Sequence, residues 1–83
     1  MEKEVPEEVA QILEGRKVED IALEVVYRNY RGEAGERRII PLKIYYGNNE
    51  YHKEEQWLLR VWDLGKNAYR DYALKDIIEW RKV

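Results

Sequence analysis

Arginine and aromatic side chains occur together at three places in this chain of 83 residues. Each place holds an arginine and an aromatic residue two positions apart: Arg28 and Tyr30, Arg60 and Trp62, Arg70 and Tyr72. Residues two apart on a β-strand point to the same side of a sheet. A guanidinium group pairs bidentately with phosphate, and an aromatic ring stacks on a base. If the three places share one face, they predict a surface that binds single-stranded nucleic acid or a nucleotide-like ligand.

Under this hypothesis, arginines hold phosphate groups and aromatic rings stack on bases. The phosphate-binding candidates are Arg28, Arg37, Arg38, Arg60 and Arg70, and the stacking candidates are Tyr30, Trp62 and Tyr72. The alternative is that Arg60 and Arg70 form surface ion pairs with Asp63, Asp71 or Asp76, where such pairs stabilise a fold little. A core position for Trp62 would also break up the predicted face.

The residue types predict neither catalysis nor a bound metal or cofactor. Cysteine, serine and threonine are absent, which removes the common hydroxyl and thiol nucleophiles and a cysteine-based zinc site. The one histidine, His52, lies near Glu50, Glu54 and Glu55 in a polar segment. We interpret these residues as solvated loop charges, because a metal site needs more clustered ligands. The expectation is a binding protein and not an enzyme.

Length and charge indicate a single small domain over residues 1–83. A domain this short buries only about 60% of its unfolded surface, so an oligomer would add stability.

The net charge of −2 is unevenly distributed. Residues 1–20 carry three basic and seven acidic side chains, a balance of −4, and residues 28–43 carry five basic and two acidic ones, a balance of +3. This asymmetry suits one face for an anion, and equally suits ordinary mixed surface charge.

The same composition favours a cytoplasmic location away from membranes. No apolar run approaches the roughly 18 residues of a membrane span. The acidic segment 1–15 does not have the pattern of a signal peptide. The absence of cysteine fits a reducing compartment.

A short helix is predicted over residues 6–14. Pro6 suits the first helical position, where its missing N–H would have no partner. Val9, Ile12 and Leu13 form an apolar stripe at helical spacing. A helix of this length is not stable alone, so it must dock on the rest of the chain.

From residue 21 onward the hydrophobic pattern has a period of two, which indicates strands. Strands are expected at residues 21–30, 37–46, 57–63 and 68–74, with a helical turn or a fifth strand at 75–81. Pro41 lacks an N–H, so its strand should be an edge strand or carry a bulge there. Ile77, Ile78 and Trp80 would seal one end. The predicted fold is mainly β with one N-terminal helix, in which residues about 20–80 form a small barrel of four to five antiparallel strands.

Several segments resemble a known family in their order and spacing. They are Tyr27, the glycines Gly32 and Gly35, and the runs 37–42 (RRIIPL), 57–63 (WLLRVWD) and 70–77 (RDYALKDI). Over about residues 9–78 this arrangement resembles the WYL domain. The resemblance implies an Sm-like or SH3-like barrel that senses nucleic acids or nucleotide-like ligands in bacterial transcription regulators or phage-defence proteins, often as a dimer. The chain departs from the family pattern at Leu58, where the namesake tyrosine would stand, and at Asp76, where a basic residue usually precedes the closing isoleucine.

A second hypothesis is a protein-interaction module. The acidic helix, the Pro41 strand edge and the strand from Trp57 to Trp62 would form the contact surface, because strand edges and exposed aromatic residues suit partner docking. The partner would be another protein, for which the domain acts as an adaptor or inhibitor, or a second copy joined through strand edges.

Overall fold

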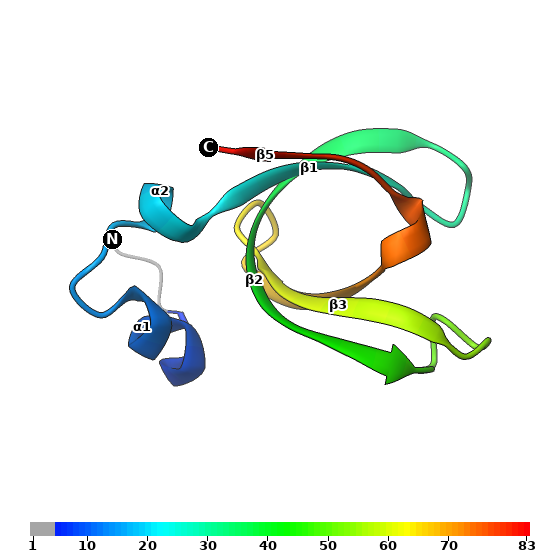
Figure 1. The fold of residues 1–83 in the computed structure, drawn as a ribbon, viewed down its shortest axis with the longest axis horizontal. Coiled ribbons are helices and arrows are strands. Elements are labelled where there is room, and N and C mark those ends of the chain that lie inside the picture. The colour runs from blue at the N-terminus through cyan, green and yellow to red at the C-terminus, as the bar shows by residue number, and fades with distance from the viewer. Residues whose placement is uncertain (1–4) are drawn as a thin grey trace.

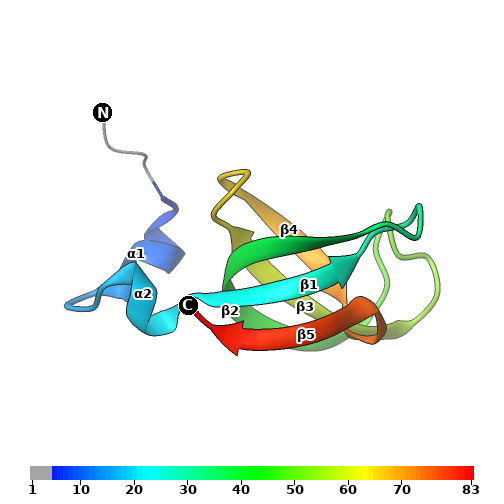
Figure 2. The ribbon, with the colours of Figure 1, turned by 90° about the horizontal axis from the view of Figure 1, so that it is seen from above.

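The computed structural model describes residues 5–83, in which two short helices precede an antiparallel sheet. The helices are α1 (Glu7–Leu13) and α2 (Val18–Ile21). The strands are β1 (Leu23–Arg28), β2 (Ala34–Gly47), β3 (Gln56–Asp63), β4 (Ala68–Ala73) and β5 (Ile77–Lys82), with a 3-10 turn, η1 (Leu74–Asp76), before the last. They form one sheet in the order β4-β3-β2-β1-β5. Figure 2 shows both helices beyond one end of the strands and the long loops at the other.

The sheet curls strongly, so that its ribbon surrounds an inner face (Figure 1). Its backbone pairing leaves β4 and β5 as the two edges, and η1 connects them. Side chains cross the interior instead. Tyr27 of β1 accepts a hydrogen bond from the backbone N–H of Ala73 in β4 at 3.2 Å. A mainly β fold with a five-stranded antiparallel sheet is therefore confirmed, whereas within residues 5–83 strand pairing does not close the sheet into a barrel.

The pairing of β2 with β3 is irregular at Pro41. The register with β3 shifts between Pro41, which pairs with Val61, and Lys43, which pairs with Arg60. This irregularity agrees with the expected bulge, since proline cannot donate to the ladder. The alternative of an edge also holds locally: β2 lies between β1 and β3 in the sheet order, but β1 pairs with β2 only as far as Ile39, so Pro41 is paired on the β3 side alone.

Apolar side chains pack on both faces of the sheet. The inner cluster contains Val25, Tyr27, Ile39, Leu59, Val61 and Tyr72. The outer cluster contains Val9, Ile40 and Trp62, with Leu13 and Tyr69 packed against it. Docking of Val9 onto Ile40 and Trp62 stabilises α1, which is too short to persist alone.

The helical and C-terminal predictions are corrected in detail. The helix α1 is confirmed within one residue at each end of 6–14, but α2 replaces the start of the strand expected at residue 21. Residues 75–81 contain both expected alternatives, the end of η1 and then β5. Ile77 packs against the inner cluster, whereas Ile78 and Trp80 are each 47% exposed and do not seal an end. None of the described helices is both long and apolar enough to cross a membrane.

Candidate ligand-binding site

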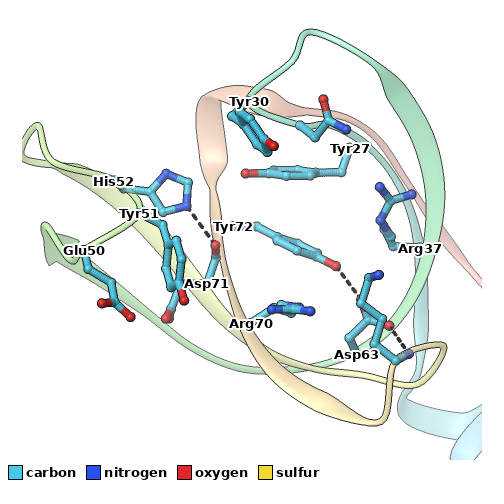
Figure 3. A pocket seen from close by; sticks show the side chains of 12 residues that line it. Tyr27, Tyr30, Arg37, Glu50, Tyr51, His52, Asp63, Arg70, Asp71 and Tyr72 are labelled. Carbon is cyan, nitrogen blue, oxygen red and sulfur yellow. Dashed lines mark hydrogen bonds between the residues drawn. The ribbon is translucent and has the colours of Figure 1, made fainter.

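An open pocket of about 720 Å³ lies on the inner face of the sheet (Figure 3). It is lined by Tyr27, Asn29, Tyr30, Arg37, Glu50, Tyr51, His52, Asp63, Lys66, Arg70, Asp71 and Tyr72. These residues come from β1, β2 and β4, from the end of β3, and from the three loops that join the first four strands. Segments distant in sequence thus meet at one site because the sheet curls.

Tyrosine rings form the centre of the pocket wall. The rings of Tyr27 and Tyr72 stack with centroids 4.2 Å apart and an angle of 21° between their planes. Both rings are buried in the inner cluster, so packing determines their orientation. Tyr30 is 90% exposed on the β1–β2 loop, and Figure 3 shows it on the side of Tyr27 away from Tyr72. Its ring is available to a ligand.

A buried carboxylate, that of Asp63, is hydrogen-bonded to one of these tyrosines. Asp63 is 2% exposed, and its Oδ1 accepts hydrogen bonds from the backbone N–H groups of Gly65 at 2.9 Å and Lys66 at 3.0 Å. Its Oδ2 accepts a hydrogen bond from the hydroxyl of Tyr72 at 2.9 Å. Three donors within the protein thus satisfy this carboxylate, as a buried charge requires. Asp63 therefore connects the β3–β4 turn to the pocket wall.

Burial raises the pKa of the Tyr72 hydroxyl above its ordinary value of 10.0, and the charge and hydrogen bond of Asp63 raise it further. Burial also raises the pKa of Tyr27, while its hydrogen bond from Ala73 acts in the opposite direction. Both tyrosines are consequently neutral at physiological pH and can donate hydrogen bonds.

Three cationic side chains reach the pocket from three elements: Arg37 from β2, Lys66 from the β3–β4 turn and Arg70 from β4. Within residues 5–83, none of the three forms a salt bridge with a carboxylate. Arg37 donates a hydrogen bond to the carbonyl oxygen of Glu36 at 3.0 Å. Gly35 gives its guanidinium room, because a Cβ there would lie 2.6 Å from an Arg37 nitrogen.

Asp71, another carboxylate of the pocket, also has partners within the protein. Asp71 accepts a hydrogen bond from the hydroxyl of Tyr45 at 2.9 Å and lies 3.8 Å from Arg60. The backbone carbonyl of Asp71 accepts a hydrogen bond from Nε2 of His52 at 2.9 Å, which holds the β2–β3 loop against β4. The three cations are therefore matched by three carboxylates, Glu50, Asp63 and Asp71, and the lining has no net formal charge. An anion can still bind locally at the guanidinium groups of Arg37 and Arg70, which pair with no carboxylate of residues 5–83.

Four of the eight residues predicted for ligand binding meet in this pocket, and four do not. Those that meet are Tyr30, Arg37, Arg70 and Tyr72. Arg28 is exposed and alternates with the inward-facing Tyr27. Arg38 lies 3.4 Å from Glu24 on the outer face, and Arg60 lies over the ring of Tyr69 at 4.4 Å.

Trp62 corrects the expectation of one shared face. It is 6% exposed and packs in the outer cluster beneath α1. The cause is the register of the β3–β4 pair, in which Val61 lies opposite Arg70. Arg70 and Tyr72 therefore share the inner face with Val61, whereas Arg60 and Trp62 point outward.

Several pocket residues were not among the predicted site residues. Tyr27 lies two positions after Val25 in a pattern of apolar residues with a period of two. This pattern indicates that the side chain is buried, but not that it lines a ligand site. The roles of Tyr51 and Lys66 depend on loop positions that the sequence pattern does not show. Asp63 before Leu-Gly-Lys-Asn is a turn signal, because aspartate oxygens accept bonds from backbone N–H groups two or three residues later. That signal predicts the two backbone bonds but not the bond from Tyr72.

Comparison with known proteins supports the fold. No protein-family model and no curated protein matches the chain. Among solved structures, the chain is similar to proteasome accessory factor B/C (PafBC) of Arthrobacter aurescens, with a TM-score of 0.57 and 18% sequence identity. The match covers 99% of this chain and 12% of the PafBC chain. At this identity the similarity shows a shared fold for a small part of the larger protein, and no more.

Proposed function

We propose that this domain is a non-catalytic regulatory module that binds a nucleotide or a single-stranded nucleic acid in the inner pocket. The observation that carries this proposal is the convergence of Arg37, Lys66 and Arg70 beside a wall of tyrosine rings. Cations without carboxylate partners suit phosphate groups, and exposed aromatic rings suit bases.

The roles of the pocket residues follow from their exposure. Arg37 and Arg70 hold phosphate through their guanidinium groups, and Lys66 adds positive charge at the same end. Tyr30, which is exposed, stacks on a base. Tyr72 is buried and holds the wall in position through Asp63. The pocket volume of about 720 Å³ is in the usual range for small-ligand sites.

The regulatory role rests on the resemblance of the sequence to the WYL domain. The similarity to proteasome accessory factor B/C supports the fold alone. We infer that the curled sheet is an Sm-like or SH3-like barrel in which side-chain contacts, such as that of Tyr27 with Ala73, take the place of strand pairing. We also infer a cytoplasmic location from the absence of cysteine.

Titration of the protein with a fluorescently labelled oligothymidylate tests the proposal. We expect saturable binding, measured by anisotropy, with an affinity that falls steeply as salt is raised, because phosphate contacts release counterions. An unlabelled mononucleotide should compete. Absence of binding at tens of micromolar protein in low salt would contradict the proposal.

An alternative proposal, a protein-interaction module, is favoured by a separate surface. Ile44, Tyr46 and Trp57 are exposed large side chains near the β2–β3 loop, and Tyr46 contacts Trp57 edge to face with centroids 5.2 Å apart. Residues 43–47 of β2 pair with β3 but not with β1. This combination of an open strand edge and aromatic side chains suits another protein or a second copy of the chain. Light scattering, with Trp57→Ala as the test variant, measures the second possibility: a monomer at all concentrations would contradict a homodimer.

A further inference from the structure

Among the described residues 5–83 the sheet has three unpaired edges, and these edges differ in charge. β4 and β5 are each paired on one side only, and residues 43–47 of β2 pair with β3 but not with β1. Charged side chains on an edge strand protect it from pairing with another chain. β4 carries Arg70 and Asp71 at its centre, and half of the residues of β5 (IIEWRK) are charged. Residues 43–47 (KIYYG) hold only Lys43, at the end of the stretch, so this edge is the least protected of the three.

Exposed apolar side chains lie beside this edge on one face of the sheet. In the β2–β3 register Ile44 lies opposite Leu59, and Tyr46 lies opposite Trp57. Directly opposed residues of an antiparallel pair point to the same face, and Leu59 belongs to the inner cluster. Ile44, Tyr46 and Trp57 therefore continue the inner face beyond the part that β1 covers. We call these three residues the apolar strip; each of them is more than half exposed.

The edge of residues 43–47 is complementary to itself. When two copies pair antiparallel about a twofold axis at Tyr45, Ile44 of each copy lies opposite the partner's Tyr46. The two apolar strips then meet on one face of the joined sheet. On the other face Lys43 lies opposite the partner's Gly47, and the two copies of Lys43 stay about 13 Å apart, four residues along the strands. The pairing thus matches apolar with apolar residues and opposes no like charges.

Charge favours the same arrangement. The β2–β3 loop, residues 48–55, carries three carboxylates and one ammonium group: Glu50, Glu54, Glu55 and Lys53. Its formal charge is therefore −2, three negative charges against one positive. In the twofold pairing this loop begins directly after Gly47 and thus beside the partner's Lys43. Lys43 forms no salt bridge within residues 5–83, so it is available to the partner's acidic loop.

The small size of this contact limits its strength. Each half-exposed side chain of the apolar strip offers about 100 Å² of accessible surface, given the 150–250 Å² that a whole aromatic side chain can bury. With the backbone edge, the two copies together bury less than the roughly 1,200 Å² of a standard interface. Contacts of this size are transient, and we expect a dissociation constant on the order of 100 µM.

We propose that two copies of this domain pair through residues 43–47 of β2, antiparallel about a twofold axis at Tyr45, and so join their two sheets into one. This inference rests on the alternative proposal of a protein-interaction module, for which it names the partner, the edge and the register. It is independent of nucleotide binding, because residues 43–47 do not line the pocket.

Sedimentation equilibrium of the full chain measures the association, at concentrations from about one tenth to about five times the expected dissociation constant. Ile44→Lys places an ammonium group against the partner's Tyr46, and we expect it to weaken the association roughly tenfold or more. Ile78→Lys is the matched control. It makes the same change at an exposed isoleucine of β5, away from the proposed interface, and should leave the association unchanged.

The register can be tested by disulfide cross-linking, because the chain has no cysteine of its own. A mixture of the Lys43→Cys and Gly47→Cys variants should form a disulfide between copies, since these positions lie directly opposite one another. A Cβ at Gly47 would lie 4.0 Å from the side chain of Tyr45, which is an ordinary contact. Each variant alone should cross-link far less, because its two cysteines lie about 13 Å apart. Lys82→Cys, at an exposed position of β5, mixed with Gly47→Cys is the matched control.

The outcomes separate this proposal from nucleotide binding. A monomer at every concentration overturns it and leaves another protein as the partner in the interaction module. Equal weakening by Ile44→Lys and Ile78→Lys also overturns it. So does a dimer in which the Lys43/Gly47 mixture cross-links no better than the Lys82/Gly47 control. None of these results bears on the oligothymidylate titration, which decides nucleotide binding by itself.

Discussion

The hydroxyl of Tyr72 donates a hydrogen bond to Oδ2 of Asp63 across 2.9 Å, and both side chains are buried. Because Oδ1 of Asp63 also accepts bonds from the β3–β4 turn, this pair connects the turn, the pocket wall and the inner core. Tyr72 in turn stacks on Tyr27. The stability of the fold and the shape of the candidate site therefore depend on the same contact.

Replacing Tyr72 with phenylalanine should destabilise the fold. The substitution keeps the ring but leaves a buried carboxylate oxygen of Asp63 without its donor, which costs about 1–3 kcal/mol. Urea denaturation followed by circular dichroism measures the change. Tyr46→Phe is the matched control, because Tyr46 is exposed and should change stability by less than about 0.5 kcal/mol. Equal effects of the two substitutions would contradict the role assigned to the bond.

Stability should also fall in alkaline solution. The pKa of Tyr72 is raised by burial and by Asp63, so above pH 10.0 the unfolded chain releases this proton more readily than the folded protein does. The contribution of the neutral Tyr72 hydroxyl to the stability of the fold is complete below that pH and is lost as the pH rises above it. Urea midpoints at about pH 8 and about pH 11 measure the loss. Tyr72→Phe should lose less stability over this interval than the unaltered protein, and the remaining loss comes from Tyr27, Tyr45 and Tyr69, whose pKa values are also raised.

Ligand binding should depend on the inward-facing arginines and not on those of the outer face. We expect Arg37→Gln with Arg70→Gln to weaken oligothymidylate binding roughly tenfold at low salt. The slope of log affinity against log salt should become shallower by about 0.7 for each phosphate group that the variant no longer neutralises. Arg28→Gln with Arg38→Gln removes the same charge away from the pocket and is the control. Similar weakening in both double variants would show that binding is a general charge effect.

Tyr30 should contribute to binding without contributing to stability. Its ring is 90% exposed at the pocket, so Tyr30→Ala removes a stacking surface while the core stays intact. Loss of one stacked base weakens binding by about 1–3 kcal/mol. Anisotropy titration and urea denaturation measure the two quantities on the same variant. Tyr46→Ala, at an exposed position outside the pocket, should leave the dissociation constant unchanged.

The docking of α1 should be detectable through Trp62. Val9 is fully buried against Ile40 and Trp62, and Val9→Ala should cost about 1–3 kcal/mol through the cavity it leaves. Val9→Asp should detach the helix and expose Trp62 to water. The two other tryptophans, Trp57 and Trp80, are already 55% and 47% exposed, so a red shift of the emission reports mainly on Trp62. Emission that stays unchanged in Val9→Asp would contradict this docking.

Local patterns in the sequence predict most elements of the fold. Alternation of apolar and polar residues indicates the strands, since the side chains of a strand point alternately to two faces. Pro41 indicates the bulge, and the stripe of Val9 and Leu13 indicates the helix. These signals depend only on neighbours along the chain. The second helix is not predicted by these patterns, because Ile21 fits the period of the strand that follows it.

The site required the tertiary structure. Arg60 and Arg70 look equivalent in sequence, each two positions before an aromatic residue, yet they lie on opposite faces. The register of β3 with β4 determines this, and hydrogen bonds between distant segments determine the register. The bond of Tyr72 with Asp63 and the joint position of Tyr30 and Tyr51 in the pocket lining likewise depend on the curl of the sheet. The sequence by itself determined that the chain forms strands, which side chains could bind an anion and which nucleophiles are missing. Only the tertiary structure decided which of those side chains share a pocket, because one position of register moves a side chain to the other face.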